Sequence, residues 1–412
     1  MRRDVPEGPT AEAVIAPASS LVHEAERLSV RDAGTDAPLV LDAGDPPKGS
    51  FVLVFGGLES APERPEPERR ATQVALAALA AGRSPVDAAV DAVTLLEDDP
   101  GRNAGYGSAL RIDGVTIEMD AAVMAEDGRF GAVAALSRVK NPVQVARAVF
   151  DTPQRLLTGM GARRFARSLG HAEFDPTTPG AQASYRSLLA SELAQDAGAA
   201  SLLPPGWQSW VDASAYSRPV PEAGTSEAGV VDGGADDAPD AAPSSAASGA
   251  VPPASPPQPV KPKPRPAPVL PPKSPPRDAG HDTVAALVRS RDAGFAGAVS
   301  SGGPPLALPG RVGDVPTPGA ALWVGKRGAV AVTGPGERIV DLGLARAVYD
   351  KLVALRSTKL AAAWGAKQLP AGTSLCVAVL DAKSFAVEPA DAMAWVGSEG
   401  DKTADSAGED KR

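Results

Sequence analysis

The sequence contains little of what several protein classes require. Among its 412 residues there is one cysteine, Cys376, and three histidines, His23, His171 and His281, which are widely scattered. No intrachain disulfide can form, and no cluster of Cys and His with zinc-site spacing is present. Because Cys376 lies within the apolar run "LCVAVL", we interpret it as a core residue.

An excess of positive charge and long apolar runs are also absent. The formal net charge is −9, which argues against nucleic acid or an anionic membrane surface as a partner. No run of about 18 apolar residues occurs, so we predict no membrane-spanning helix. The opening "MRRDVPEGPTAEAVIAPASS" lacks the continuous apolar segment of a secretory signal, and we expect a cytoplasmic protein.

Proline is abundant and unevenly distributed. Of the 42 prolines, 17 lie within residues 218–277. Because proline lacks the N–H that a sheet ladder needs, this segment predicts an extended linker. We therefore divide the chain into five parts: a flexible N-terminal extension (1–49), a first structured half (50–171), a Pro- and Ala-rich linker (172–282), a second structured half (283–400) and a polar tail (401–412).

Strand-like apolar runs and helical spacing occur in both halves. In the first half we predict strands over 51–55, 115–124 and 130–136, and helices over 67–82, 84–99, 142–150 and 161–170. In the second half we predict strands over 283–290, 295–301, 320–325, 328–334, 374–381 and 384–389, and one long helix over 337–357. Two sheet-forming halves with their own helices predict an α/β sheet sandwich, covered by helices on both outer faces.

One threonine marks the junction between linker and second half. Thr283 follows Asp282 and begins the run "TVAALVRS". A threonine at the N-terminus of a chain carries its own base, the free α-amine. An internal threonine gains that amine if its hydroxyl attacks the preceding carbonyl and water hydrolyses the ester formed. By itself, however, "HDT" is more typical of an ordinary strand start.

Motifs on both sides of the linker strengthen the catalytic interpretation. After Thr283 come "VSSGG" (299–303), "PGRVGDVP" (309–316) and "TGPGE" (333–337). The first half contains "LEDDPGRNAGYGSAL", "EMDAAVM" and "GAVAALSRVKNPVQVAR". Together these segments resemble the plant-type asparaginase family of N-terminal-nucleophile hydrolases, which includes isoaspartyl peptidase, glycosylasparaginase and taspase. The resemblance covers about 51–170 and 281–400, and it implies a four-layer αββα sandwich and a dimer of self-cleaved α/β heterodimers.

The resemblance also implies catalytic roles for the matching residues. The cleavage site would lie between Asp282 and Thr283, and Thr283 would be the nucleophile. Thr333 and the N–H of Gly334 would hold the oxyanion, which needs donors aimed at the developing charge. The two remaining implied catalytic residues are Ser301, whose hydroxyl would bond the nucleophile, and Asn103, which would face the active site.

Substrate and ion contacts are implied in the same way. Arg311 would grip the substrate α-carboxylate as a planar fork, and Asp314 would pair with the α-ammonium. Gly334 would also contact substrate, and Gly336 would leave room for it. The only cofactor implied is a structural sodium ion bound by backbone carbonyls of the 96–106 loop, at Leu96, Glu97, Asp99, Arg102, Ala104 and Tyr106.

We therefore expect an amidohydrolase that acts on L-asparagine or β-aspartyl (isoaspartyl) dipeptides. Keeping both Arg311 and Asp314 lets the pocket meet a free amino-acid head group, whereas taspase lacks the acid at this position. A taspase-like threonine endopeptidase and a glycosylasparaginase remain alternatives. An inactive homologue serving as a binding or scaffold protein is the alternative of another class, because the family's "HGGAG" reads "FGGLES" here, with Phe55 replacing the histidine.

Overall fold

The computed structural model describes residues 48–193, 210–211, 283–400 and 402–408. The predictions for residues 1–47, for the proline-rich segment and for Asp282 lie outside these ranges. None of the described helices is both long and apolar enough to cross a membrane.

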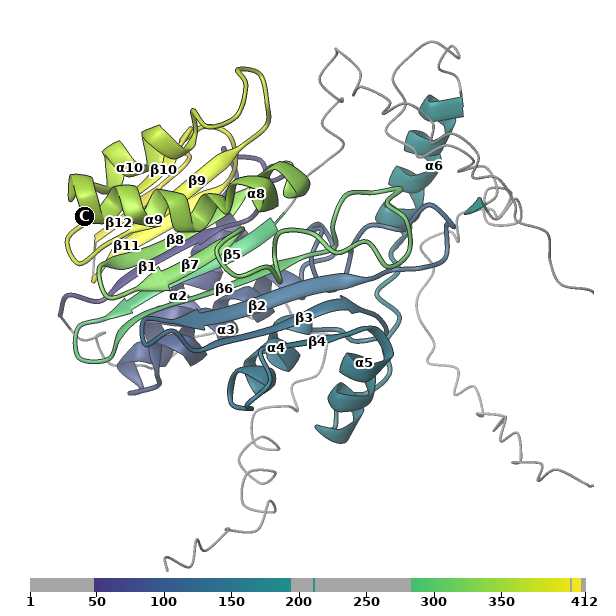
Figure 1. The fold of residues 1–412 in the computed structure, drawn as a ribbon, viewed down its shortest axis with the longest axis horizontal. Coiled ribbons are helices and arrows are strands. Elements are labelled where there is room, and N and C mark those ends of the chain that lie inside the picture. The colour runs from purple at the N-terminus through teal and green to yellow at the C-terminus, as the bar shows by residue number, and fades with distance from the viewer. Residues whose placement is uncertain (1–47, 194–209, 212–282, 401, 409–412) are drawn as a thin grey trace, which may run out of the picture. The chain divides into compact units, whose positions relative to one another are not determined.

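The described chain forms two β-sheets and eight helices (Figure 1). The larger sheet contains β1 (Phe51–Phe55), β2 (Met119–Ala125), β3 (Phe130–Leu136), β4 (Leu156–Thr158), β5 (Thr283–Ser290), β6 (Gly294–Ser301), β11 (Trp395–Glu399) and β12 (Lys402–Asp405). The smaller sheet contains β7 (Leu322–Gly325), β8 (Gly328–Thr333), β9 (Cys376–Leu380) and β10 (Phe385–Glu388). The helices are α2 (Glu66–Ala80), α3 (Pro85–Glu97), α4 (Pro142–Phe150), α5 (Gly159–Ser168), α6 (Pro179–Leu193), α8 (Gly336–Leu342), α9 (Leu344–Leu355) and α10 (Thr358–Gly365).

The larger sheet combines strands from before and after the linker, and β1 is inserted between strands from the second half. Its order is β12-β11-β1-β5-β6-β2-β3-β4, and the smaller sheet has the order β10-β9-β8-β7. Neighbouring strands are antiparallel except for β3 and β4. Strand β1 lies between β11 and β5, both of which come from the second half.

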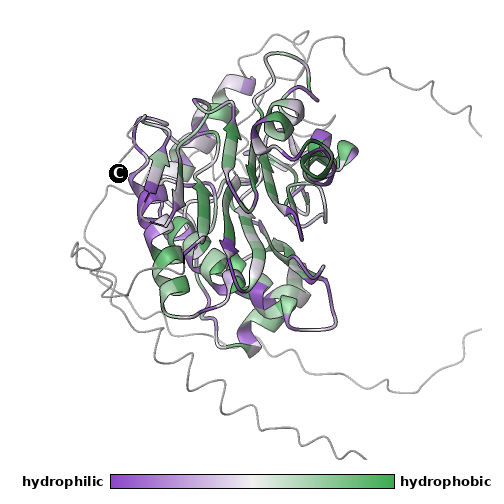
Figure 2. Ribbon diagram, turned by 90° about the vertical axis from the view of Figure 1, so that its left-hand side faces the viewer, coloured by the Kyte–Doolittle hydropathy of each residue, from purple (hydrophilic) through white to green (hydrophobic). Residues whose placement is uncertain are grey.

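Three apolar clusters separate four layers. Strand β1 shows the pattern, because Phe51, Leu53 and Phe55 pack in the cluster between the sheets while Val52 and Val54 lie on the opposite face, which packs against helix α2. A third cluster joins the smaller sheet to α9 and α10. Figure 2 shows the strands between the helical layers coloured mostly as hydrophobic. Burial on both faces of each sheet confirms the predicted αββα sandwich.

The prediction of one long helix over 337–357 was wrong in one respect. It is two helices, α8 and α9, because Gly343 between them has φ +53°. Glycine adopts this left-handed conformation without the steric cost that other residues meet. The C-terminal side of the predicted strand over 115–124 forms β2, but residues 113–116 form a turn in which the Asp113 carboxylate accepts from the backbone of Val115 and Thr116.

Four elements were not predicted: β4, β11, β12 and α10. The segment 401–412, expected to be a polar tail, contributes β12 as an edge strand that pairs with β11. The predicted linker also begins with an ordered helix, α6, which buries Tyr185 and Leu189 against Leu110 and Ile117.

Candidate active site

Three polar side chains form a row across three strands of the larger sheet. Thr283 is the first residue of β5 and pairs in register with Ser301, the last residue of β6. Ser301 pairs in turn with Asp120 near the start of β2. Residues paired in this way point to the same face, with Cβ atoms about 4.5–5.5 Å apart. This face is the one toward the second sheet, and all three residues are buried.

The second sheet supplies Thr333, the last residue of β8. The backbone nitrogen of Thr283 donates to the Thr333 hydroxyl at 3.2 Å. The next residue, Gly334, fits tightly, since a Cβ there would lie 2.9 Å from the Ser374 carbonyl oxygen. The structure therefore brings the predicted nucleophile beside the predicted oxyanion pair.

Asn103 supports the turn that follows Ser301. Its side-chain amide donates to the Gly303 carbonyl at 2.8 Å, and its backbone carbonyl accepts from Gly302 at 2.7 Å. The Ser301 hydroxyl accepts from Gly303 N at 3.0 Å. Asn103 Oδ1 also accepts from Ala109 N at 2.8 Å, so this side chain connects two loops. The structure thus places Asn103 next to the nucleophile row, as predicted.

Arg311 and Asp314 converge at Gly336. A Cβ at Gly336 would lie 2.6 Å from Arg311 Nη2 and 2.8 Å from Asp314 Oδ1. Only glycine therefore allows the two predicted substrate-binding side chains to meet here. Arg311 also contacts the Glu337 carboxylate, with Nε at 2.9 Å and Nη2 at 2.8 Å from Oε1. Because the Glu337 side chain is 65% exposed, this ion pair is screened by water and contributes little to stability.

Asp314 is a buried carboxyl with an unusual protonation equilibrium. Its pKa is raised to about 7, mainly by burial; Arg311 opposes the rise, and the negative charges of Asp120 and Glu337 add to it. Its Oδ2 is buried with no hydrogen-bond partner among the described residues. A cationic group entering next to Asp314 would therefore stabilise its ionised form.

A cavity of about 220 Å³ lies next to Asn103. Its walls include Glu59 of the "FGGLES" segment, Arg102, Leu110, Pro305 and, from α6, Tyr185. Burial raises the pKa of Glu59. Asn103 lines this cavity, whereas Thr283 does not.

The "FGGLES" segment, which departs from the family pattern, is mostly buried and hydrogen-bonded to neighbouring segments. Phe55 is fully buried in the core between the sheets, where the family has a histidine. A Cβ at Gly56 would lie 1.9 Å from Glu68 Oε1, because Gly56 packs on the buried Glu68–Arg102 ion pair of 2.7 Å. Gly56 N also donates to the Ala394 carbonyl at 3.1 Å. The departure from the family pattern thus adds an apolar residue to the core.

The loop predicted to bind sodium packs tightly against Glu97 at the end of helix α3. Gly105 has φ +59°, and a Cβ there would lie 2.6 Å from the Glu97 carbonyl oxygen. The Leu96 carbonyl accepts from the backbone N–H groups of Asp98 and Asp99, whereas the carbonyls of Glu97 and Asp99 accept from Tyr106 and Arg102, respectively. A carbonyl oxygen has two lone pairs, so the carbonyls of Glu97 and Asp99 retain acceptor capacity for a hard cation, and the sodium ion stays a prediction. Within the described ranges, no group of three or more His, Cys, Asp or Glu offers a side-chain metal site.

Three charged residues of the site were not predicted. Glu337 lies within the quoted "TGPGE", and Asp120 lies within "EMDAAVM", but neither had been given a role. Arg111, which is fully buried beside the Arg311 loop, follows the quoted "NAGYGSAL" segment. The signal for each was its position within or next to a matching motif. Cys376 is buried and its pKa is raised to about 12, which confirms its predicted role in the core.

Comparisons with known proteins agree with this geometry. A family model described as "Asparaginase" matches residues 59–213 and 251–383. The chain is 47% identical over 131 residues to an isoaspartyl peptidase/L-asparaginase of Danio rerio, a match covering 30% of this chain and 41% of the relative. It is 53% identical over 94 residues to the protein of that name from Rattus norvegicus (22% and 28%) and 52% identical over 97 residues to a plant-type L-asparaginase of Pyrococcus abyssi (23% and 32%). The matched segments span less than half the length of each of these relatives.

Proposed function

Because the chain belongs to the asparaginase family of N-terminal-nucleophile hydrolases, we propose that it is a self-cleaving threonine amidohydrolase acting on L-asparagine and β-aspartyl dipeptides. One observation carries the proposal. The nitrogen of Thr283 lies 3.2 Å from the Thr333 hydroxyl, in a site that also holds the convergent pair Arg311 and Asp314. The names of the relatives, isoaspartyl peptidase/L-asparaginase and plant-type L-asparaginase, support this choice of substrate.

The first step we propose is maturation. The Thr283 hydroxyl attacks the carbonyl carbon of Asp282, a C–O bond forms, and the C–N bond between the two residues breaks. The nitrogen of Thr283 takes up the proton and becomes a free α-amine. Water then hydrolyses the ester, which releases the carboxylate of Asp282 and restores the threonine hydroxyl.

The second step is hydrolysis of substrate by the same hydroxyl. The new α-amine accepts the hydroxyl proton as the oxygen attacks the amide carbonyl of the substrate. Because the Thr333 hydroxyl already accepts from the nitrogen of Thr283, its own proton is directed elsewhere and can be donated to the oxyanion, together with Gly334 N–H. The amine returns the proton to the leaving group, which departs as ammonia or an amino acid, and water cleaves the acyl-enzyme.

Substrate selection in this proposal depends on two charges. The Arg311 guanidinium already pairs with a carboxylate, that of Glu337, so it has the orientation needed for the α-carboxylate of a substrate. Asp314 is buried, and its Oδ2 has no hydrogen-bond partner within the described ranges, so it supplies the negative charge for the α-ammonium. A substrate with a free amino-acid head group satisfies both residues, whereas an internal aspartyl peptide bond satisfies neither.

Four further features belong to the proposal. The carbonyls of the 96–106 loop would hold sodium as a structural ion, away from the reacting atoms. The cleaved halves would pair as a dimer of α/β heterodimers, as expected from the family resemblance. The negative net charge favours a small-molecule substrate over nucleic acid, and we place the enzyme in the cytoplasm.

Incubation of the purified full chain tests the proposal. Intact mass spectrometry should show fragments of 282 and 130 residues (412 − 282 = 130), and Thr283→Ala should stay whole. The matured protein should release aspartate from L-asparagine and from a β-aspartyl dipeptide. Activity only on glycosylated asparagine or on an internal aspartyl peptide bond would select one of the alternative enzymes. A cleaved protein that hydrolyses none of the four would point to the scaffold alternative.

A further inference from the structure

We infer that Asp120 is a positioning residue that holds the Arg311–Asp314 loop at a fixed distance from the nucleophile row; this inference rests on the proposed function. Asp120 is 3% exposed and stands in register with Ser301, which is itself in register with Thr283. It therefore occupies the same row as the nucleophile, two strands away. Strands lie about 4.8 Å apart, so the row spans roughly 10 Å.

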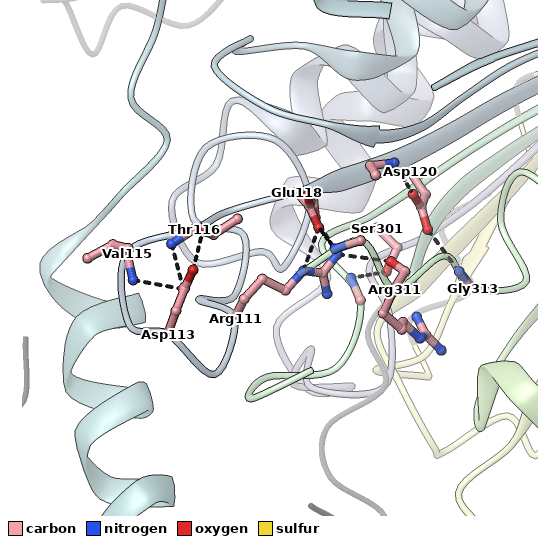
Figure 3. Close-up of polar contacts among 12 residues, drawn as sticks. Arg111, Asp113, Val115, Thr116, Glu118, Asp120, Ser301, Arg311 and Gly313 are labelled. Atoms are coloured by element: carbon pink, nitrogen blue, oxygen red, sulfur yellow. Dashed lines mark hydrogen bonds and ion pairs between the residues drawn. The ribbon is translucent and has the colours of Figure 1, made fainter. Parts of the chain in front are cut away.

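Asp120 uses its two carboxylate oxygens to bond two different segments. Oδ1 accepts from Ala135 N at 2.9 Å, and Oδ2 accepts from Gly313 N at 3.1 Å (Figure 3). Gly313 lies between Arg311 and Asp314 in the chain. A carboxylate has no proton to donate, so both contacts require the amides as donors, and both favour the ionised carboxylate.

The segment on the Oδ1 side is an irregularity in the sheet. The pairing of β2 with β3 shifts between Met119 and Ala121, so that two residues of β3 stand opposite Asp120. One of them, Ala135, has φ +48°, which is costly for a residue with a Cβ. The Asp120 carboxylate satisfies the amide of this bulge. The hydrogen bond to the bulge therefore holds the Asp120 side chain in one position.

The segment on the Oδ2 side carries the two substrate-binding residues. A Cβ at Gly313 would lie 2.5 Å from Arg311 Nη1, so the Arg311 guanidinium folds closely over this glycine. Asp314 follows directly in the chain. Moving the amide of Gly313 would therefore move both charged side chains relative to Thr283.

A second acid, just before the same strand, supports the same loop. Glu118 lies two residues before Asp120, and its carboxylate accepts from Gly310 N at 2.6 Å. The fully buried Arg111 donates to the Glu118 carbonyl at 2.9 Å and approaches the Arg311 carbonyl at 3.5 Å (Figure 3). Residues 310–313 are thus held at both ends by acids at the N-terminal end of β2, with Asp120 at the end nearer the nucleophile.

The test compares Asp120→Asn and Asp120→Ala with wild type. Asn keeps one acceptor and turns a donor toward the other amide, whereas Ala leaves both buried amides without a partner. In the matured enzyme we expect the KM for L-asparagine and the inhibition constant of L-aspartate to rise at least tenfold for Asn and further for Ala. We expect kcat to fall by a smaller factor, and the fraction of chain that self-cleaves to stay near wild type, because self-cleavage uses no free α-carboxylate.

Asp113→Asn is the matched control. Asp113 is also an acid of the segment leading into β2, but it bonds only within its own turn, to Val115 and Thr116 (Figure 3). Its variant should leave the L-aspartate inhibition constant within twofold of wild type. If Asp120→Ala does not fold, Asp120→Asn decides the matter. Asp120→Asn with an unchanged KM and inhibition constant, or with only a lower melting temperature, would overturn the inference while leaving the proposed function intact. A wild-type enzyme that hydrolyses neither L-asparagine nor a β-aspartyl dipeptide would refute both the inference and the proposed function.

Discussion

The backbone nitrogen of Thr283 and the hydroxyl of Thr333 are joined by a hydrogen bond of 3.2 Å that crosses from one sheet to the other. Thr283 begins β5 of the larger sheet, and Thr333 ends β8 of the smaller one. Elsewhere the two sheets meet through apolar side chains. This polar contact at the end of the interface brings the reacting groups of the proposed mechanism together, and the first prediction concerns it.

Replacing Thr333 by valine keeps the shape of the side chain but removes the hydroxyl. We expect kcat for L-asparagine to fall by about 10²–10³, the usual effect of losing one oxyanion donor, with little change in KM. Steady-state kinetics on matured enzyme would measure this. Thr72→Val is the control, because Thr72 is also buried, at 2% exposed, and its hydroxyl makes only a long contact of 3.5 Å to Val396. A Thr333→Val enzyme with wild-type kcat would remove Thr333 from the mechanism.

Replacing Arg311 by lysine keeps the charge but loses the planar fork. We expect kcat/KM for L-asparagine to fall about 30- to 1000-fold, or roughly 2–4 kcal/mol, since a point charge cannot make the two-pronged contact. Self-cleavage should continue in this variant. Arg147→Lys serves as the control, because Arg147 makes comparable ion pairs with Asp87 and Asp151 on the helical surface. Wild-type activity in Arg311→Lys would show that another residue grips the carboxylate.

Asp314 should set part of the pH dependence. Its pKa is about 7, and it must be ionised to hold the α-ammonium, so kcat/KM should fall as the pH drops through 7. The negative charge of Glu337 raises this pKa. Glu337→Gln should therefore move the acidic limb to lower pH, whereas Asp341→Asn on the same helix, whose partner is Arg338, should not. An acidic limb that stays in place in Glu337→Gln would assign it to another group, such as the α-amine of Thr283, whose ordinary pKa is about 8.

The raised pKa of Asp314 also predicts how the free energy of unfolding depends on pH. The folded value of about 7 lies above the ordinary value of 3.8, so the folded state retains a proton that the unfolded state loses. The corresponding contribution to stability is present below pH 3.8 and is lost as the pH rises through 7. Thermal melts of wild type between pH 5 and 8 should show this decline from Asp314, and Asp314→Asn should reduce it. An identical pH dependence in both proteins would contradict the assignment.

Helix α6 and the proline-rich segment 218–277, which both belong to the predicted linker, should respond differently to mutation. Deleting residues 218–277 should leave hydrolysis nearly intact, because their proline content predicts no core contribution and halving a flexible spacer changes closure free energy by about 0.6 kcal/mol. In contrast, Leu189→Ala in α6 should destabilise the fold by roughly 2–5 kcal/mol, since Leu189 is fully buried. Ser187→Ala, at an exposed position of the same helix, is the control. Chemical denaturation would measure the free energies of unfolding. Loss of self-cleavage in a folded 218–277 deletion would show that this segment positions the cleaved bond.

Much of the fold could be predicted because its strands are continuous apolar runs. The segments 51–55, 130–136 and 283–290 form strands with the predicted bounds, and 142–150 forms the predicted helix. The break at Gly343 was missed, since a single glycine inside a helical pattern does not reveal whether its φ is positive. The edge strand β12, "KTAD", was missed because an edge strand exposes polar side chains and shows no apolar run.

The candidate site was predictable only where a motif marked it. Thr283, Ser301 and Thr333 come together as expected. The roles of Asp120 and Glu337 could not be read from the sequence, because they depend on contacts across about 190 and 26 residues of chain, respectively. Such contacts are set by sheet register and loop packing, which local patterns do not encode.

Because β1 lies between β11 and β5, cleavage before Thr283 would change how many chains separate when the protein unfolds. If the chain is cut before Thr283, β1 belongs to one polypeptide and both of its neighbours belong to the other. The two products then share one hydrogen-bonded sheet, and neither can lose its structure without releasing its partner. Unfolding of the cut form thereby releases one more separate chain per protomer, so the midpoint of thermal denaturation should rise more steeply with protein concentration for the cut form than for Thr283→Ala.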